Sequence, residues 1–349
     1  MKIAIIGAGF FGLHVASILK QKDPNIKMDI FDMAETPMSG ASVNNQNRLH
    51  LGFHYPRSGY TIYQSIMGYD YYLKYYGDCV TPVSDNYYAI HENGEIGAKE
   101  YLAVMDAFSL DYSFADKKSI KFKNPNEISL LLKAPEQLIN SNLVRNKLLS
   151  SLSQALFIQA EIDNIDAELG YVYSKDKCLG KYDYIVNATY MNPNLGLSKK
   201  NSFQLKHELT LLLSGQTNLP FSTAITIMDG PFCSIYPHQG GLHTLSSVLH
   251  TPFIEYLNID NLYSNYKIKK NLSEKLKVKE RILAHVQELV DVKFELKECL
   301  LSTKTKLLTD KGDSRVTEVK RNGKVISVMC GKLDAVIFAT KGVLEEIYG

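Results

Sequence analysis

The chain has 349 residues, of which 45% are hydrophobic and 22% charged, the composition of an ordinary globular protein with a sizeable core. Its 39 basic and 37 acidic residues leave a formal net charge of +2 without a basic run, which argues against nucleic acid as a partner. The five cysteines are widely spaced and form no CxxC pair, so the sequence predicts neither a disulfide framework nor a metal site, and a reducing cytoplasm fits best.

The apolar stretch at residues 3–19 has to be distinguished from a signal peptide. It contains three glycines and His14, runs into the polar residues 20–23 and shows no small-residue cleavage site. No other segment approaches the roughly 20 apolar residues that are needed to cross a bilayer. We therefore expect a cytoplasmic protein without a membrane span.

A glycine-rich turn follows the first predicted strand, residues 2–6, and opens a predicted helix at residues 13–20. The turn reads GAGFFG, so Gly7, Gly9 and Gly12 occupy the three glycine positions of a dinucleotide-binding fingerprint. The first glycine permits the tight turn, the second lets the backbone approach a pyrophosphate, and the third lets helix and strand pack closely. The sequence therefore predicts a βαβ unit whose helix N-terminus, including Phe10 and Phe11, faces a bound dinucleotide.

An acidic residue completes this fingerprint. The second predicted strand, residues 27–31, ends at Asp32, about 20 residues past the last glycine, where a carboxylate can accept both ribose hydroxyls. Glu35 is the alternative acid. The carboxylate argues against a 2′-phosphate and hence against NADP, but the motif alone does not separate FAD from NAD.

The segment at residues 42–56 carries a family resemblance. It resembles the stretch after the second strand in the D-amino-acid-oxidase-like superfamily, which includes glycine oxidase, sarcosine oxidase and L-2-hydroxyglutarate dehydrogenase. The family pattern ends roughly in His-x-Gly-x-Tyr-Tyr-Pro; His50, Gly52, Tyr55 and Pro56 match it, and His54 stands where a tyrosine is expected. The resemblance implies that FAD is the cofactor. It also implies that this segment contacts the flavin through candidates Asn44, Gln46, Arg48, Leu49 and His50.

Three further segments extend the resemblance. Residues 182–189 are similar to the D-x-V-V-N-A-T-G strand of two-dinucleotide-binding-domain flavoproteins, which implies FAD contacts at Ala188 and Thr189, with Tyr190 in place of the glycine. Residues 156–162 resemble the strand whose backbone meets the adenine, which gives Ile162 that role. Residues 325–347 resemble the closing strand and helix, which implies flavin contacts at Gly331, Lys332 and Leu333, with the Lys332 charge near the N1 and O2 edge.

The predicted fold class is α/β, with a Rossmann-like FAD-binding domain interleaved with a mostly antiparallel α+β substrate domain. The motif positions place the FAD domain at residues 1–80, 134–200 and 300–349, and the resemblance implies a substrate domain in the two gaps, at 81–133 and 201–299. Strands are expected at 86–91, 205–213, 224–228 and 232–236, with a hairpin signal at Asp229-Gly230. Helices are expected at 138–152 and within 262–290. The tyrosine-rich residues 60–76 predict an amphipathic helix that packs its aromatic stripe on the sheet, in preference to an aromatic binding box.

The catalytic candidates are His50, Arg57, Tyr236 and His238. Arg57, like Arg48, could grip a carboxylate or phosphate through two hydrogen bonds, or could form an ordinary ion pair. His50 could take a substrate proton or bind the flavin ring. Tyr236 and His238 share one strand face at a strand end that relatives direct at the substrate.

These residues predict an FAD-dependent oxidase or dehydrogenase that oxidises a CH–NH or CH–OH bond of a small polar substrate, anionic or sugar-like, by hydride transfer to flavin N5. The electron acceptor is open, with molecular oxygen as one candidate, and so is the oligomeric state. A redox-neutral mutase or isomerase of a nucleotide-linked sugar is the first alternative. A non-catalytic flavin-binding scaffold is the second, because Tyr190 and the glycine-poor C-terminal motif depart from the family pattern.

Overall fold

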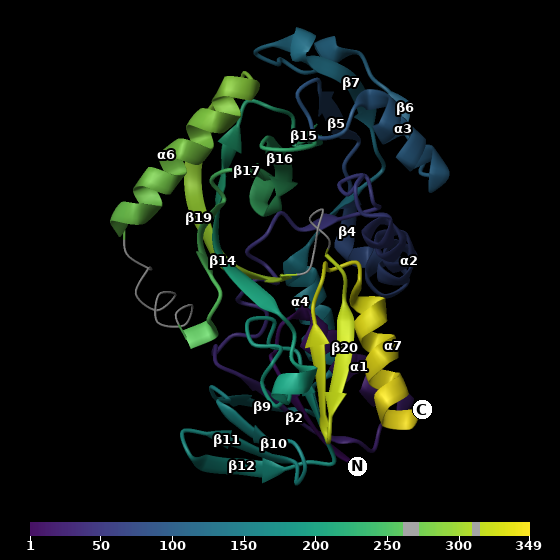
Figure 1. Cartoon of the computed structure of the whole chain (residues 1–349), viewed down its shortest axis with the longest axis vertical. Helices are drawn as coiled ribbons and strands as arrows, with labels where there is room; N and C mark the ends of the chain where they lie inside the picture. The colour runs from purple at the N-terminus through teal and green to yellow at the C-terminus, as the bar shows by residue number, and fades with distance from the viewer. Residues whose placement is uncertain (261–271, 309–314) are drawn as a thin grey trace.

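The computed structural model describes residues 1–260, 272–308 and 315–349. Its first sheet has the strand order β20-β21-β13-β1-β2-β9 and lies in the lower half of Figure 1 together with both termini. The neighbours from β21 to β9 are parallel, and β20 is an antiparallel edge strand. The bounds are β1 (Lys2–Ile6), β2 (Lys27–Asp32), β9 (Leu156–Gln159), β13 (Tyr184–Asn187), β20 (Glu318–Asn322) and β21 (Val325–Met329). The central strands are continuous apolar runs because both of their faces are buried.

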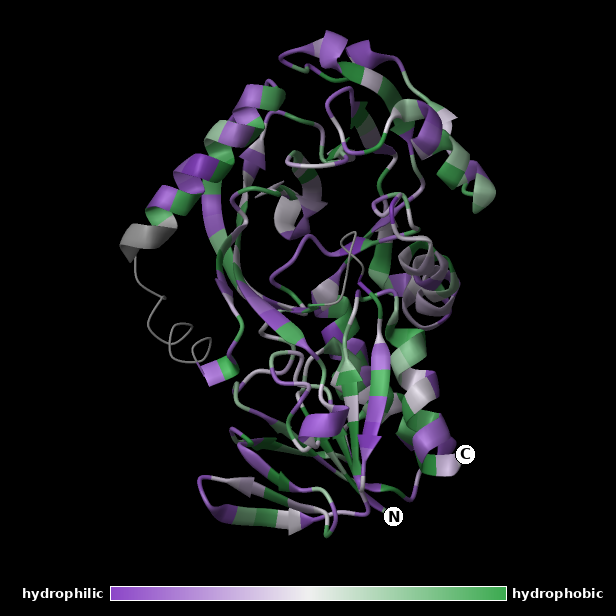
Figure 2. Ribbon diagram, viewed as in Figure 1, coloured by the Kyte–Doolittle hydropathy of each residue, from purple (hydrophilic) through white to green (hydrophobic). Residues whose placement is uncertain are grey.

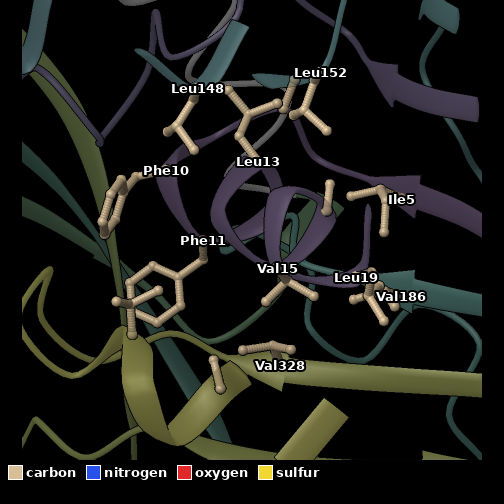
Figure 3. Packing of buried hydrophobic residues seen from close by; sticks show 14 of the residues in the cluster. Ile5, Phe10, Phe11, Leu13, Val15, Leu19, Leu148, Leu152, Val186 and Val328 are labelled. Carbon is tan, nitrogen blue, oxygen red and sulfur yellow. The ribbon is translucent and has the colours of Figure 1, made fainter. Parts of the chain in front are cut away.

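Helix α1 (Phe10–Lys22) is the centre of the core beside this sheet. Figure 3 shows Leu13 facing Leu148 and Leu152 on one side of the helix, while Val15 faces Val328 on the other. The flanking helices are α4 (Ser141–Ser151) and α7 (Val336–Tyr348). The Asn140 side chain caps α4 by accepting a hydrogen bond from the Leu143 N–H at 3.2 Å.

The tyrosine stripe of α2 (Gly59–Tyr76) packs on α1, and not directly on the sheet as the sequence suggested. The Tyr72 and Phe10 ring centroids are 5.6 Å apart. The buried His14 side chain has its Nδ1 2.6 Å from the Tyr76 hydroxyl and its Nε2 3.1 Å from the Tyr71 hydroxyl. The stripe is therefore part of the core. It contacts α1 because α1 lies between it and the sheet.

The second sheet has the order β18-β14-β17-β16-β15-β5-β7-β6, and β19 pairs with β14. All of its pairs are antiparallel except β5 with β15. The four strands expected in this region are present, and β15 and β16 form the hairpin at Asp229-Gly230. The bounds are β5 (Asp85–His91), β6 (Ser113–Phe114), β7 (Ile128–Lys133), β14 (Leu205–Thr217), β15 (Thr223–Met228), β16 (Cys233–His238), β17 (Leu242–Ser247), β18 (Pro252–Tyr256) and β19 (Phe294–Leu307).

Helix α6 (Leu272–Leu289) covers this sheet from outside. Figure 2 shows polar and apolar residues alternating along it, because Val278, Ile282 and Val286 are buried against the sheet while charged residues face out. The first part of the helical prediction, residues 262–271, lies outside the described residues. No helix among the described residues is long and apolar enough to cross a membrane.

Two small sheets and several short elements complete the structure. One sheet joins β10 (Asn164–Asp166), β11 (Tyr171–Ser174) and β12 (Lys177–Lys181). The other has the order β3-β8-β4 and joins β3 (Arg48–Leu49), β8 (Gln137–Ile139) and β4 (Val80–Pro82). The remaining elements are α3 (Ala98–Ala107), η1 (Gly77–Cys79), η2 (Lys117–Ser119), η3 (Pro125–Glu127), η4 (Lys199–Asn201) and η5 (Gln239–Gly241). The predicted α/β fold class is confirmed, while the domain boundaries stay a prediction.

Candidate active site

A cavity of about 1480 Å³ is lined by residues of both large sheets and of the 38–57 segment. It runs from the glycine-rich loop after β1, past the end of β13 and the 330–333 loop, to the β15, β16 and β19 strands. Pockets for a drug-sized ligand usually measure about 300–1,000 Å³. The cavity is therefore large enough for an extended cofactor and a second small molecule.

The three fingerprint glycines differ in what the fold requires of them. Gly7 has a φ of +101°, and a Cβ there would lie 2.6 Å from the Ala188 carbonyl oxygen. A Cβ at Gly12 would collide with the Gly7 carbonyl, so this glycine allows helix and strand to pack. A Cβ at Gly9 would meet only the Ser42 Oγ, at 3.1 Å, and Gly9 lines the cavity. The missing side chain of Gly9 therefore leaves a cradle beside the N-terminus of α1, which fits a pyrophosphate.

Asp32 lies at the end of β2 and lines the same end of the cavity. Its Oδ2 accepts a hydrogen bond from the Ala8 N–H at 2.7 Å, and its Oδ1 accepts one from the Ala34 N–H at 2.8 Å. Burial raises the pKa of Asp32, and the two backbone hydrogen bonds oppose that shift. Each oxygen keeps a further lone pair that a ribose hydroxyl could use.

Most of the predicted cofactor-binding residues line the cavity. They are Gly7, Gly9, Phe10, Phe11, Asp32, Asn44, Gln46, Arg48, His50, Ile162, Ala188, Thr189, Gly331, Lys332 and Leu333. Gly12 and Leu49 are not among the lining residues: Gly12 packs under the turn, and Leu49 is fully buried in the core. The residues that line the cavity fit FAD along the length that the family resemblance implies.

Arg48 is held in place by a buried network. Its guanidinium donates to the Tyr88 hydroxyl at 2.9 Å and to the Ser234 Oγ at 3.0 Å, and it lies 4.0 Å from the centroid of the Tyr236 ring. Its Nη1 is 3.6 Å from the Glu136 Oε2, and both side chains are almost completely buried. The guanidinium is therefore occupied by protein partners beneath the cavity wall.

Glu136, which sequence reasoning missed, is the centre of this network. It accepts hydrogen bonds from the Leu51 N–H at 2.9 Å and from the Tyr88 hydroxyl at 2.7 Å. Burial alone would raise the pKa of Glu136, but His50, Arg48 and the Leu51 N–H lower it below the usual range of a glutamate. No local motif marks this residue, because only the pairing of β3 with β8 brings it to Arg48.

Two histidines and a lysine lie together on the cavity wall. The His50 Nδ1 is 3.5 Å from the Glu136 Oε1, and the His50 and His54 ring centroids are 5.5 Å apart. Burial, together with the nearby Lys332 charge, lowers the pKa of His50 to about 3; burial also lowers that of His54, so both rings are neutral at physiological pH. The Lys332 Nζ donates to the Ser65 Oγ at 2.8 Å and lies 3.5 Å from the centroid of the Tyr55 ring.

Burial also lowers the pKa of Lys332, to about 8, so that its ammonium is still mostly charged at neutral pH. Near a flavin, such a charge stabilises the reduced anionic ring.

The remaining catalytic candidates lie in three different environments. Arg57 lines the cavity, but its guanidinium is bound by Asp229 and Glu95. Tyr236 is fully buried beneath Arg48 and donates to the Gln137 carbonyl at 3.1 Å. Tyr236 and His238 are not among the lining residues, because β16 continues past the cavity to its last residue, His238. Of the four catalytic candidates, His50 and Arg57 therefore line the cavity, and Tyr236 and His238 do not.

Comparisons with known proteins find FAD-dependent relatives. No protein-family model matches the chain. The FAD-dependent monooxygenase FPY4 of Fusarium mangiferae is 29% identical over 355 aligned residues, covering 99% of this chain and 90% of that protein. Among solved structures, NikD, an unusual amino acid oxidase essential for nikkomycin biosynthesis, matches with a TM-score of 0.76 at 10% identity, over 99% of this chain and 93% of that one.

The L-α-glycerophosphate oxidase of Mycoplasma pneumoniae, solved with FAD bound, matches with a TM-score of 0.74 at 14% identity, over 99% of this chain and 94% of that one. The glycine oxidase of Geobacillus kaustophilus gives 0.71 at 11% identity, over 99% and 93%. The fold is thus that of an FAD-dependent flavoprotein. With the full-length relative, it confirms the resemblance seen in the sequence to the FAD-dependent oxidoreductases of the D-amino-acid-oxidase-like superfamily.

Proposed function

We propose that the chain is an FAD-dependent oxidase or dehydrogenase that removes a hydride and a proton from a CH–OH or CH–NH group of a small polar substrate. The observation that carries this proposal is the continuity of the cavity from the Gly9 cradle to the β15 and β16 strands. A cofactor laid along the fingerprint and a substrate seated against the strands would share one enclosed space. The bound FAD supplies the hydride acceptor.

The protein residues bind and orient in this reaction. Gly9 and Asp32 hold the dinucleotide end, and Lys332 places a positive charge in the part of the cavity that His50 and His54 also line. The two histidines are neutral, so they can accept a hydrogen bond from a substrate O–H or N–H without adding charge. The hydroxyls of Thr226 and Ser234 line the opposing strands and can hold a polar substrate in place.

The sequence-based expectation of an anionic substrate rested on free guanidinium groups at Arg48 and Arg57. Both guanidinium groups are bonded to carboxylates or hydroxyls of the protein. Of the two substrate types that the sequence predicts, anionic and sugar-like, we therefore keep the uncharged, sugar-like one. The second candidate function is monooxygenation, which the name of the Fusarium mangiferae relative favours.

The test is anaerobic mixing of the FAD-loaded protein with a panel of alcohols, amines, amino acids, hydroxy acids and sugars. The proposal expects loss of the oxidised flavin absorbance with at least one alcohol or amine, together with one equivalent of the carbonyl or imine product. In a parallel aerobic reaction under ¹⁸O₂, incorporation of the label into the product would favour the monooxygenase. Sustained turnover without any electron acceptor would replace the proposal with the redox-neutral mutase or isomerase.

A further inference from the structure

Three charged residues from three separate segments meet where the cavity wall is exposed. Arg57 follows the 50–56 segment, Glu95 lies in the turn after β5, and Asp229 lies in the β15–β16 turn. All three line the cavity, and their side chains are 34%, 55% and 13% exposed, respectively. We call them the Glu95–Arg57–Asp229 cluster. They line the cavity at a point that solvent reaches, and we take this point as its opening.

The cluster is closely bonded. The Arg57 Nε donates to the Asp229 Oδ2, its Nη2 donates to the Asp229 Oδ1 at 3.3 Å, and its Nη1 lies 2.9 Å from the Glu95 Oε2. The two acidic segments are also joined through the backbone, since the Glu95 N–H donates to the Asp229 carbonyl at 2.7 Å. The guanidinium is therefore directed at two protein carboxylates.

The charges of the cluster do not cancel. Two carboxylates face one guanidinium, so the formal charges of these three side chains sum to one negative charge. Like charges a few ångströms apart repel even in water, and the repulsion is stronger beside a protein wall of low dielectric constant. An incoming carboxylate or phosphate would be opposed there, whereas a neutral or amine-bearing molecule would not.

The adjoining cavity wall formed by residues 226–252 adds no positive charge of its own; the lysines and arginines that line the cavity elsewhere, Arg48, Lys304, Lys306, Arg315 and Lys332, belong to other segments. Among the cavity-lining residues between positions 226 and 252, all within the described part of the chain, Asp229 is the only charged one. The others are hydroxyl-bearing or apolar, and include Thr226, Ser234, Ser246 and Met228. Arg48 also lines the cavity, but its guanidinium is bonded to Ser234 and Tyr88 and lies close to Glu136.

From this juxtaposition we propose that the enzyme selects substrates without a carboxylate or phosphate, and that Glu95 and Asp229 set this selectivity by neutralising Arg57 at the opening. The substrate class is a neutral or amine-bearing molecule with hydroxyl groups. The inference rests on the proposed function, because it names the kind of molecule that the same cavity admits.

The test uses the FAD-loaded protein and a double variant, Glu95→Gln with Asp229→Asn. These amides keep the size of the acids and leave Arg57 with a net charge of +1 in the cluster. A matched control, Asp291→Asn with Glu346→Gln, removes the same charge from exposed ion pairs outside the cavity. The first readout is the rate of flavin reduction by sodium dithionite, an anionic reductant, as a function of ionic strength. It needs no enzymatic turnover.

We expect the wild-type rate to rise with added salt, because salt screens a repulsion. In the double variant the rate at low salt should increase at least about 5-fold, which corresponds to about 1 kcal/mol of repulsion removed, and should then fall with salt. The control variant should behave like the wild type. A wild-type rate that falls with salt, or a double variant indistinguishable from the control, overturns the inference.

The second readout separates this inference from the proposed function. Each reducing substrate found in the panel is compared with a matched carboxylate-bearing analogue. In the wild-type protein, the neutral member should reduce the flavin at least about 10-fold more efficiently than the carboxylate member. In the double variant, this ratio of efficiencies should be smaller. A preference for the carboxylate member overturns the inference while leaving the oxidoreductase intact. A flavin that no panel member reduces contradicts the proposed function, and the dithionite result still decides the charge of the opening.

Discussion

Replacing Glu136 with alanine should destabilise the protein severely, although this residue lies in no sequence motif. The change removes a carboxylate whose side chain is 0% exposed and leaves the Arg48 guanidinium, 1% exposed, without its counter-charge. It also leaves the Leu51 N–H and the Tyr88 hydroxyl without their acceptor. Removing one partner of a buried ion pair costs about 3–5 kcal/mol, because the remaining charge is buried and uncompensated.

For a chain of 349 residues, with an unfolding entropy of about 2.1 cal/mol/K per residue, that loss lowers the Tm by about 4–7 °C. Differential scanning calorimetry of the FAD-loaded protein measures it. Glu136→Gln, which keeps most of the hydrogen bonds but removes the charge, should fall between wild type and Glu136→Ala. The exposed Glu168→Ala is the control and should shift the free energy of unfolding by less than about 0.5 kcal/mol. If Glu136→Ala unfolds at the same temperature as that control, the network does not stabilise Arg48 as described.

Three other predictions follow from single contacts. Gly9→Val should abolish FAD retention and leave the circular dichroism spectrum unchanged, because its side chain would project into the cradle and meet only Ser42 in the fold; retention at wild-type affinity contradicts the fingerprint. Burial lowers the pKa of His14 to about 3, so below pH 6.5 this histidine binds a proton in the unfolded chain but stays neutral in the folded chain. The free energy of unfolding should therefore fall by about 2 kcal/mol from pH 7 to pH 5, as measured by urea titrations. His14→Gln should show correspondingly less of that loss, and an equal loss would refute the assignment. Lys332→Met should lower the two-electron flavin potential by about 30 mV, corresponding to about 1.4 kcal/mol, in a spectroelectrochemical titration, and an unchanged or higher potential would show that its charge does not reach the ring.

The sequence predicts those parts of the structure that depend on neighbours in the chain. The strand, glycine turn, helix and acid from residue 2 to Asp32 form a local unit, and each piece appears where its spacing indicates. The β15–β16 hairpin follows for the same reason, since Asp229-Gly230 joins two apolar runs directly. The buried packing of the α2 tyrosines also follows from helical spacing, but the partner they pack against does not.

What the sequence could not provide depends on long-range pairing. Glu136 contacts Leu51 across 85 positions, and Arg57 meets Asp229 across 172 positions, so neither contact leaves a local pattern. An arginine beside a flavin segment suggests an anion site when its neighbours are unknown. Two acids from other segments surround that arginine, which is why we propose a substrate without a carboxylate or phosphate, whereas the sequence predicted an anionic or sugar-like one.

The most direct test of the account is identification of the cofactor released on denaturation of the purified protein, by mass spectrometry and absorbance. The account rests on a cavity that holds FAD from the Gly9 cradle and Asp32 to Lys332. It predicts a yellow protein that releases about one FAD per chain, and much less from Asp32→Ala, because FMN has no adenosine ribose for that carboxylate to bind. A colourless protein that binds NAD, or one that releases FMN, would contradict it.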